Sequence, residues 1–383
     1  MPLTEFRSSG IRICHFCSTT LDSHYFESLG TGLLSRGAHL LLCSLSETQT
    51  PKWLGDTGSG RRFVSLNSSS KSGYTRAIVS LARLLRKERI QILQTHLFDA
   101  GVVGIIAARL ARIPITILTR HHTDEVRLIG SRFHVGLDRW MARKADRVVV
   151  FSHAVRNYMV SNEHLPAEKI DVIYQGFDFE RFSATEKERK RVRAEFNLTS
   201  EFVIGSVGRL FKIKGHVYLL TALKDLAKEI PHVRLLLVGG GNQTTVKKMV
   251  HDLGLEDRVL FAGHRRDVAA CLRAMDLVVH PSLAEAFCQV LVESMSVGTP
   301  VVATDVGGAA EVITHGKTGM LVSAASPEAI YRAVLELYHD PEGRRIMAAA
   351  AQTSVHARFT VERMVTQQIH CYERLLDHDS YHN

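Results

Sequence analysis

The chain has 383 residues, 45% of them hydrophobic, and its mean hydropathy is close to zero. This length suits two domains of about 150–200 residues each. The longest apolar segment, GVVGIIAARLARIPITIL, is interrupted by Arg109, Arg112 and Pro114, which excludes a bilayer-spanning helix at this place. The N-terminus MPLTEFRSSGIRIC lacks the apolar core of a signal peptide, so we expect a cytoplasmic protein.

The net charge of +9 is unevenly distributed, because residues 1–182 carry +8 of it. The excess lies in RLLRKER (83–89) and SRFHVGLDRWMARKADR (131–147), which suits either solvated helix faces or an acidic partner. No base-stacking aromatics alternate with the arginines, so we expect no nucleic-acid partner. We hypothesise a peripheral position on the inner face of an anionic membrane, with these residues against the lipid: Arg83, Arg86, Lys87, Arg139, Trp140, Arg143 and Lys144.

The first half of the chain alternates between β-rich and helical sequence. A strand over 11–16 leads through the loop CSTTLDSH into a helix that ends near Gly37. The strand AHLLLCS and the amphipathic helix TRAIVSLARLLRKER follow. Three further β-rich runs, each separated by helical sequence, are IQILQTH, PITILTR and DRVVVFS. This alternation predicts a parallel sheet built from βαβ units.

Six scattered cysteines fit a reducing compartment. Cys14 and Cys17 form a lone C-x-x-C, and without a second pair we expect them to pack in the first strand and not to bind zinc.

The βα rhythm restarts after the charged segment SATEKERKRVRAEFNLTSE, with the β-rich runs FVIGSVG, VRLLLVGG, RVLFAG, LVVHPS and PVVAT. We therefore expect two Rossmann-like, doubly wound α/β domains that face a cleft. The predicted parts are a first domain over 1–175, a linker over 176–200, a second domain over 201–360, and a C-terminal helix over 361–383 that packs back on the first domain. The whole stretch from 341 is expected to be helical.

Two glutamates, Glu285 and Glu293, stand around the start of the predicted helix CQVLVESMSVG, at the ligand end of a strand. The first backbone N–H groups of a helix favour an anion such as phosphate. Carboxylates accept hydrogen bonds from vicinal hydroxyls. The pattern therefore predicts a diphosphate at the helix start with sugar hydroxyls on both sides, although Glu285 also suits a plain helix-start acid.

Two cations, Arg209 and Lys214, bracket the loop GRLFKIKGH after the first strand of the second domain. Converging on one diphosphate, they would stabilise a leaving group as its charge develops. Lys212 lies between them and could be mistaken for the functional lysine, which we expect to be Lys214. Because Arg209 and Lys214 supply the positive charge opposite the diphosphate, and no Asp-x-Asp motif lies at a strand end, we expect no metal and no cofactor.

These motifs resemble those of family 4 glycosyltransferases, which are retaining enzymes of the GT-B fold. The family's paired glutamates correspond to Glu285 and Glu293, and its R-L-x-x-x-K-G corresponds to the segment that begins with Arg209. VLVGGGNQ and VIYQGFDFERF also match, so the resemblance covers most of 170–340. Over the first 170 residues it rests mainly on topology.

The resemblance implies an acceptor-binding first domain and a second domain that binds a nucleoside diphosphate sugar, such as a UDP- or GDP-sugar. The implied catalytic residues are His121, Arg209, Lys214 and Glu285. The implied donor-binding residues, with Glu293 on the ribose, are Gly208, Phe287, Cys288, Gln289, Val290 and Glu293. The family histidine that contacts the donor sugar corresponds to His121, with His122 as the alternative.

Two departures from the family concern Cys288, where many relatives have glycine, and the first loop, which lacks the Gly-Gly of many relatives. Hydroxyls of Thr19, Thr20 and Ser23 are the candidates to replace that loop's donors. Gly307, Gly308 and Glu311 are expected to be structural.

The predicted reaction transfers a sugar, with retention, to a hydroxyl of a glycan, lipid-linked or cell-envelope acceptor. The alternatives are a nucleotide-sugar 2-epimerase on the same fold and an inactive sugar-nucleotide-binding protein.

Overall fold

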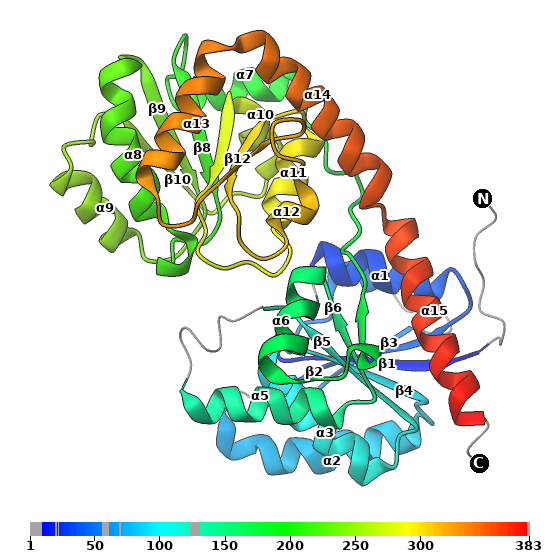
Figure 1. Ribbon diagram of the computed structural model, residues 1–383. Helices are drawn as coiled ribbons and strands as arrows, with labels where there is room; N and C mark the ends of the chain where they lie inside the picture. Colours follow the sequence, from blue (N-terminus) through cyan, green and yellow to red (C-terminus); the bar gives the residue numbers. More distant parts are fainter. Residues whose placement is uncertain are drawn as a thin grey trace. The chain divides into compact units, whose positions relative to one another are not determined.

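The computed structural model describes residues 10–19, 21, 23–55, 61–68, 70–122 and 131–380. The chain divides into two compact units (Figure 1). Unit 1 consists of Met1–Phe177 and Thr360–Asn383, and unit 2 consists of Asp178–Phe359. The last helix therefore belongs to the unit that contains the N-terminus.

The described part of unit 1 contains a seven-stranded parallel sheet in the order β3-β2-β1-β4-β5-β6-β7. Its central strands are apolar and buried on both faces, as expected for a parallel sheet covered by helices. The strands are β1 Arg12–Cys17, β2 His39–Ser44, β3 Arg61–Ser65, β4 Ile92–His96, β5 Ile115–Arg120, β6 Arg147–Val150 and β7 Ile170–Val172.

Helices cover both faces of this sheet. On one face α1 packs against α15, and on the other α3 packs between α2 and α5. Figure 1 shows these two layers, with α15 (red) beside α1 and with α2 and α3 (blue to cyan) on the opposite side of the strands. The helices are α1 His24–Leu34, α2 Tyr74–Lys87, α3 Phe98–Ala111, α5 Arg132–Lys144, α6 His153–Glu163 and α15 Val361–Ser380.

Unit 2 contains, among its described residues, a six-stranded parallel sheet in the order β10-β9-β8-β11-β12-β13. Its strands are β8 Phe202–Val207, β9 Val233–Val238, β10 Val259–Gly263, β11 Leu277–His280, β12 Val301–Thr304 and β13 Met320–Val322. Its helices are α7 Glu186–Glu195, α8 His216–Glu229, α9 Gln243–Asp252, α10 Val268–Ala274, α11 Gln289–Ser296, α12 Ala309–Val312, α13 Pro327–His339 and α14 Pro341–Arg358.

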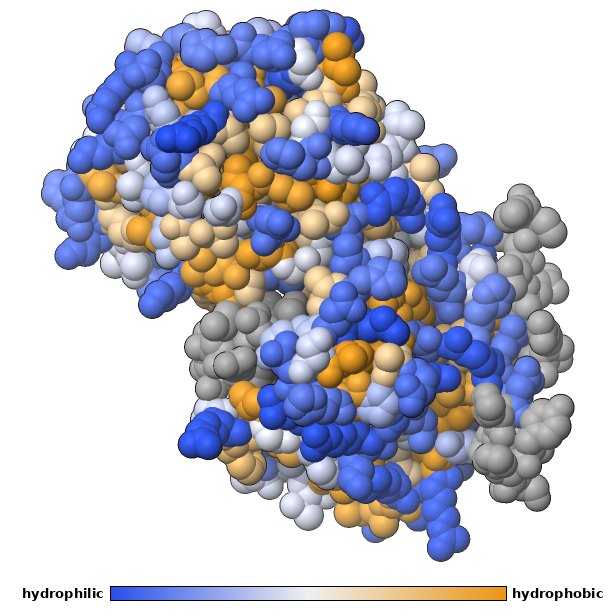
Figure 2. Space-filling model, viewed as in Figure 1, coloured by the Kyte–Doolittle hydropathy of each residue, from blue (hydrophilic) through white to orange (hydrophobic). Residues whose placement is uncertain are grey.

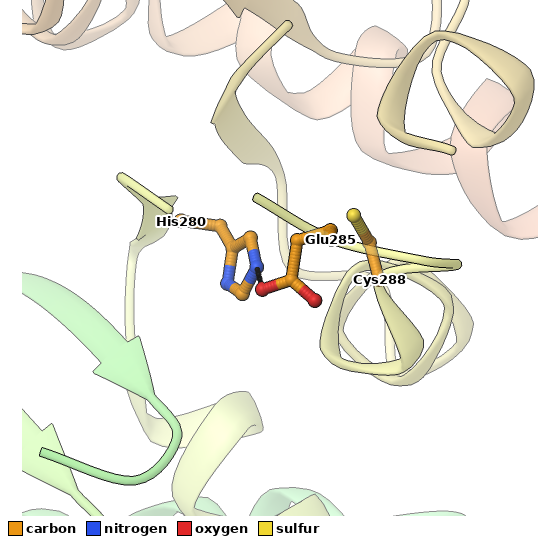
Figure 3. A group of neighbouring side chains, drawn as sticks. All are labelled: His280, Glu285 and Cys288. Carbon is orange, nitrogen blue, oxygen red and sulfur yellow. Dashed lines mark hydrogen bonds and ion pairs between the residues drawn. The ribbon is translucent and has the colours of Figure 1, made fainter. Parts of the chain in front are cut away.

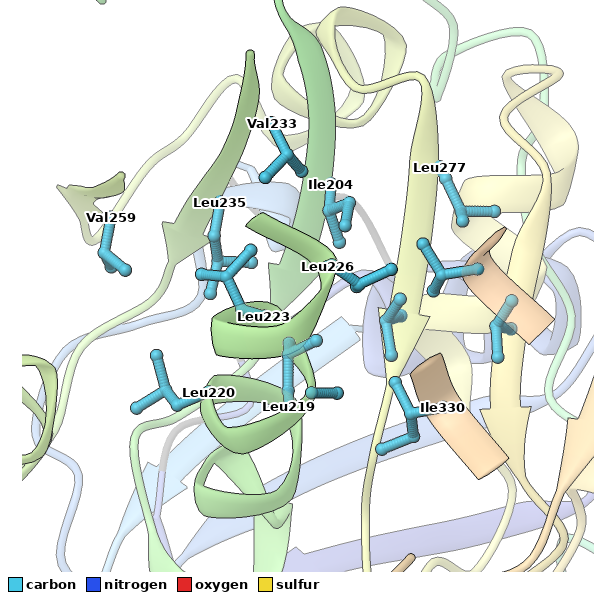
Figure 4. Packing of buried hydrophobic residues seen from close by; sticks show 14 of the residues in the cluster. Ile204, Leu219, Leu220, Leu223, Leu226, Val233, Leu235, Val259, Leu277 and Ile330 are labelled. Carbon is cyan, nitrogen blue, oxygen red and sulfur yellow. The ribbon is translucent and has the colours of Figure 1, made fainter. Parts of the chain in front are cut away.

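The core of unit 2 lies between α8 and the sheet. Leu219, Leu223 and Leu226 recur at helical spacing on α8, are fully buried and meet side chains such as Ile204 and Leu235 of the strands (Figure 4). This packing fixes where α8 begins, and therefore where the loop between β8 and α8 lies.

In both sheets the strand order reverses at the centre, between β1 and β4 in unit 1 and between β8 and β11 in unit 2. Loops at the carboxyl ends of strands diverge at such a switch point and leave room for a ligand. The polar residues discussed below follow or end these central strands.

The two-unit α/β architecture agrees with the sequence prediction, but two segments differ from it. Residues 176–200, expected as a linker, do not form one: from Asp178 onward they belong to unit 2, where α7 packs against α10. The capping box between Thr185 and Glu188 starts α7. The C-terminal stretch is not helical throughout, because Phe359 and Thr360 separate α14 from α15.

Cys14 and Cys17 are both free and buried in β1. They pack in different hydrophobic clusters, on opposite faces of the sheet, so they cannot share a metal ion. No helix in the described residues is long and apolar enough to cross a bilayer.

The core packing predicts the effect of shortening one side chain. Leu226→Ala should lower the free energy of unfolding of unit 2 by about 2–5 kcal/mol, because it removes a fully buried side chain and leaves a cavity. Lys224→Ala, at an exposed position of the same helix, should change it by less than about 0.5 kcal/mol. Urea unfolding of both variants measures this; equal losses would contradict the core assignment.

Candidate active site

The loop after β8 is drawn against the loop after β11 by two backbone contacts. A 3-10 turn, η4 (Lys212–Lys214), leads to Gly215, whose φ is +65°. A Cβ at Gly215 would lie 2.0 Å from the carbonyl oxygen of Pro281, so only glycine fits there. The backbone N–H of Leu283 donates to the carbonyl of Ile213 at 2.8 Å. Lys214 is thereby held beside the residues that follow β11.

Glu285 receives three polar groups on one carboxylate oxygen. The ammonium of Lys214 lies 2.5 Å from Oε1, the imidazole Nε2 of His280 lies 2.8 Å from it, and Ser282 Oγ donates to it at 2.7 Å. Figure 3 shows the imidazole of His280, at the end of β11, facing the carboxylate. Glu285 is itself only 8% exposed. The carboxylate is therefore compensated by charge and by hydrogen bonds where water reaches it poorly.

This environment keeps Glu285 ionised. Burial by itself would raise the pKa of the carboxyl, but His280 and Lys214 lower it more, so the pKa lies well below its usual range. His216 neighbours this cluster, and burial together with His280 and Lys214 lowers its pKa to about 4. His216 is therefore neutral at physiological pH and adds no charge to the cluster.

A third loop supports Glu285 from the end of β12. Gly307 has a φ of +53°, and a Cβ there would lie 1.6 Å from the backbone carbonyl oxygen of Glu285. Gly307 was expected to be a structural turn. Position 307 requires glycine because the backbone of Glu285 passes directly over it.

Glu293 lies on α11, is half-buried, and occupies a different environment from Glu285. Burial raises the pKa of its carboxyl to about 7, and no cation among the described residues offsets this. The two glutamates of the motif are thus an anion fixed by its neighbours and a carboxyl that exchanges its proton near neutral pH.

The start of α11 agrees with the helix predicted from sequence. Cys288 is the N-cap and has a φ of +67°, a left-handed conformation that is unfavourable for residues with a Cβ. A glycine would adopt this conformation readily. Phe287 is buried against Phe359, whereas Gln289 is exposed and Val290 half-buried.

Arg209 is exposed, and its guanidinium lies over the ring of Phe211, 4.8 Å from the centroid. It follows Gly208, whose N–H donates to the carbonyl of Val238 at 2.9 Å. Arg209 and Lys214 share one loop, but only Lys214 contacts Glu285. Lys212, the other lysine of this loop, is exposed.

A metal ion is poorly suited to this site. The ligand atoms of His280, Glu285 and Cys288 lie within 4.8 Å of one another, a spacing that a metal could bridge. The ammonium of Lys214, however, contacts the same carboxylate oxygen and would repel a cation there.

The two candidate histidines of unit 1 lie in different surroundings. His121 Nε2 is 3.2 Å from Nδ1 of His96, and the His121 ring contacts Tyr25 and Phe151. His122 Nε2 is 3.5 Å from a carboxylate oxygen of Asp138, beside the buried guanidinium of Arg120. Arg120 also pairs with buried Glu163 at 2.6 Å, so His122 borders a structural ion cluster.

In the first loop, Ser23 caps α1, because its Oγ accepts the N–H of Phe26 at 3.5 Å. Thr19 is exposed, and its carbonyl accepts from Ser44 Oγ at 3.2 Å. Thr20 lies outside the described residues. The Ser23 oxygen therefore acts as an acceptor in this cap, which leaves its O–H able to donate to a ligand.

Sequence reasoning missed His280 and Ser282 as partners of Glu285. Both stand in HPSLAEAF, where polar residues directly follow a buried strand, and that change was the available signal. Spacing alone could not show that their side chains turn back onto Glu285.

Two family models match the chain. The model described as glycosyl transferases group 1 matches residues 187–354, and the one described as glycosyltransferase family 4 matches residues 23–181. The first match contains the loops of β8, β11 and β12, and the second contains His96 and His121.

Curated relatives and solved structures point the same way. N-acetyl-alpha-D-glucosaminyl L-malate synthase of Bacillus anthracis is 29% identical over 80% of this chain and 81% of its own. D-inositol 3-phosphate glycosyltransferase of Corynebacterium kroppenstedtii is 31% identical over 75% of this chain and 67% of its own. The structure of Anabaena HepE in complex with UDP-glucose superposes with a TM-score of 0.81, at 25% identity, over 93% of this chain and 98% of that one.

The raised pKa of Glu293 predicts how the ligand-free protein responds to pH. The folded carboxyl binds its proton more tightly than the unfolded one, so its stabilisation is full below about pH 4.5 and is lost as pH rises through about 7. Glu293→Gln, which cannot ionise, should therefore be more stable than the wild type at pH 8, by about 1–3 kcal/mol, and about equally stable at pH 4.5. Thermal unfolding at both pH values measures this; a difference that is the same at both would contradict it.

Proposed function

The chain belongs to the glycosyl transferases group 1 family, and from this membership we propose that it transfers a hexose from a UDP-sugar to a hydroxyl acceptor with retention of configuration. That it is a glycosyltransferase of the GT-B fold follows from the family models and the structural neighbours. The donor, the acceptor and the stereochemistry are the proposal.

The observation that carries the proposal is the ionised Glu285 beside Lys214 at the switch point of unit 2. An ammonium has three N–H donors, and Glu285 uses one of them, which leaves Lys214 able to hold a phosphate oxygen as well. We assign the diphosphate to Lys214, Arg209 and the first turn of α11, a hydroxyl of the donor sugar to Glu285, and the ribose to Glu293. His121 is assigned to the donor sugar, as in the family.

The proposed reaction is a front-face substitution at the anomeric carbon. A bond forms between the acceptor oxygen and that carbon while its bond to the diphosphate oxygen breaks. The departing oxygen takes the proton of the acceptor hydroxyl. Lys214 and Arg209 stabilise the negative charge that develops on the diphosphate. Glu285 is held by three partners, which suits a fixed acceptor of sugar hydroxyls better than a nucleophile.

We further propose that donor binding requires no metal ion, since Lys214 and Arg209 supply the positive charge that a metal would otherwise provide. The position of Lys214 against Glu285, which disfavours a cation at the one described cluster of potential ligands, supports this.

The runner-up activity is a nucleotide-sugar 2-epimerase, and an inactive binding protein is the third alternative. Incubation with UDP-glucose and a panel of hydroxyl acceptors, followed by assays for UDP and for the product anomer, separates the three. We expect acceptor-dependent UDP release and a product with the donor's anomeric configuration. Acceptor-independent loss of the donor would favour the epimerase, and binding without turnover would favour the inactive protein.

We also propose that unit 1 meets an anionic, lipid-bearing surface through the layer formed by α2, α3 and α5. The exposed cations Arg83, Arg86 and Lys87 lie on α2, and the exposed Ile106 and Leu110 lie on the adjacent α3. Figure 2 shows mostly hydrophilic residues over these helices, with hydrophobic ones between them. Cations around exposed aliphatic side chains suit the headgroup region of an anionic bilayer.

The α5 part of the hypothesised set is engaged within unit 1. Arg139 and Trp140 are half-buried, and Arg139 and Arg143 donate to carbonyls near the end of α6. Lys144 is exposed. On α2, Arg86 likewise donates to the carbonyl of Leu110, so the proposed contact is centred on Arg83 and Lys87 of α2 and on the exposed side chains of α3.

Lys214→Gln should lower kcat with UDP-glucose by about 100-fold or more while it weakens UDP binding much less, because the charge acts chiefly on the leaving group. Glutamine still offers Glu285 a hydrogen bond, which limits the loss of stability. Lys212→Gln, two residues away and exposed, is the matched control and should keep kcat within about twofold. Equal effects of the two variants would refute the assignment.

Vesicle co-sedimentation tests the membrane contact. The wild type should bind vesicles of anionic phospholipid at low salt, lose most binding at high salt and bind neutral vesicles weakly. Arg83→Glu with Lys87→Glu should abolish binding, whereas the same charge change at the exposed Lys224 and Lys248 of unit 2 should not. Binding that is insensitive to salt, or equal loss in both double variants, would overturn the contact.

A further inference from the structure

A chain of buried polar side chains crosses the face of the unit 1 sheet that α1 and α15 cover. His15 of β1 is in register with Gln94 of β4, and His96 is in register with Thr119 of β5. Residues in register on parallel strands point to the same face of a sheet. The rest of this face is apolar, so these polar groups must be paired with one another.

The contacts form one continuous line. His121 Nε2 lies 3.2 Å from His96 Nδ1, and His96 Nε2 lies 2.9 Å from His15 Nδ1. His15 Nε2 lies 3.2 Å from the hydroxyl of Tyr372 on α15, and that hydroxyl donates to Gln94 Oε1. His15, His96 and Tyr372 are at most 2% exposed, whereas His121, at the outer end, is half-buried.

The amide of Gln94 sets the direction of this line. Its Nε2 donates to Thr119 Oγ1 at 2.7 Å and approaches Gln368 Oε1 at 3.5 Å, which leaves Oε1 to accept from Tyr372. With its proton committed to Gln94, the Tyr372 oxygen can only accept a proton from His15. The opposite direction would require the amides of both Gln94 and Gln368 to be turned over, since otherwise their oxygens would face each other. The present orientation leaves Gln368 Nε2 buried without a hydrogen-bond partner among the described residues, so the histidine tautomers are the observable that distinguishes the two directions.

The same donor-to-acceptor direction then holds for each hydrogen bond between the histidines, because a neutral imidazole has only one N–H and can donate through only one nitrogen. His15 donates through Nε2, so its Nδ1 accepts from His96 Nε2–H. His96 Nδ1 in turn accepts from His121 Nε2–H. Burial lowers the pKa of His15 and of His121 to about 3, and burial and its two imidazole neighbours hold the pKa of His96 well below its usual range. All three rings are therefore neutral at physiological pH.

We propose that this chain fixes His121 in the tautomer with a proton on Nε2 and none on Nδ1, so that His121 meets its substrate as an uncharged acceptor for a sugar hydroxyl. The substrate part rests on the proposed function. His96, His15, Tyr372 and Gln94 are positioning residues, because they act through His121. The C-terminal helix thereby contributes to substrate recognition through the fully buried side chain of Tyr372.

Nitrogen-15 NMR of the full-length protein with labelled histidine tests the tautomer without any ligand. The spectrum should show three coupled neutral rings, each with Nε2 protonated and Nδ1 bare. Nδ1-protonated rings at these positions, or a charged ring at pH 7, would overturn the proposal. In Tyr372→Phe the ring of His15 loses its acceptor, so His121 should become a mixture of tautomers.

Binding measurements with UDP and UDP-glucose test the consequence. Tyr372→Phe should lower the affinity for UDP-glucose relative to that for UDP by about fivefold, the effect of one neutral hydrogen bond, and should leave UDP affinity unchanged. Cys371→Ala is the control for lost packing, because Cys371 is buried on the same helix but takes no part in the line of hydrogen bonds from His121 to Gln94. It should change neither the ratio of the two affinities nor the His121 signals. An unchanged ratio in Tyr372→Phe would refute the role in recognition.

The two proposals fail in different ways. If the wild type binds neither UDP nor UDP-glucose, the proposed donor is wrong, and the ligand-free spectrum decides the tautomer by itself. If the wild type binds UDP-glucose but shows the opposite tautomer, the proposed donor is supported and the proposed direction of the hydrogen bonds is wrong.

Discussion

The site of unit 2 depends on keeping one buried carboxylate ionised. An uncompensated charge in the interior costs several kcal/mol, so Glu285 is tolerable only while Lys214, His280 and Ser282 converge on it. These partners come from the carboxyl end of β11 and from the loops that follow β8 and β11, and the glycine at 307 lets a third loop approach. The electrostatic requirement therefore holds together the loops to which we assign the donor.

In unit 1, the buried polar groups of one sheet face are compensated by neutral hydrogen bonds, without ionised partners. Its sheet carries a row of polar side chains on an apolar face, and these are satisfied by a line of neutral hydrogen bonds that ends in α15. A neutral line has a direction, and the direction determines which nitrogen of His121 carries the proton. In both units the chemistry gathers where the strand order reverses, because only there do neighbouring loops diverge.

The sequence predicted the two α/β units and the central strands, because long apolar runs identify strands buried on both faces. It missed the edge strands β3, β7 and β13: β7 and β13 have only three residues each, and β3, RRFVS, is too polar to stand out. Lys214 and Glu285 could be selected from their motifs. The role of His280 could not, and neither could the line from His15 to Tyr372, because these residues are joined only by the register of the strands and the packing of α15.

The most direct test of the account is the thermal stability of the wild type with UDP-, GDP- and ADP-glucose in buffer that contains a metal chelator. We expect UDP-glucose to stabilise the protein without metal, by about 2.7 kcal/mol at a concentration 100 times its Kd, and to do so more than the other two nucleotide sugars. No stabilisation by any of them, or stabilisation that appears only when a divalent metal is restored, would contradict a metal-free donor site held by Lys214 and Arg209.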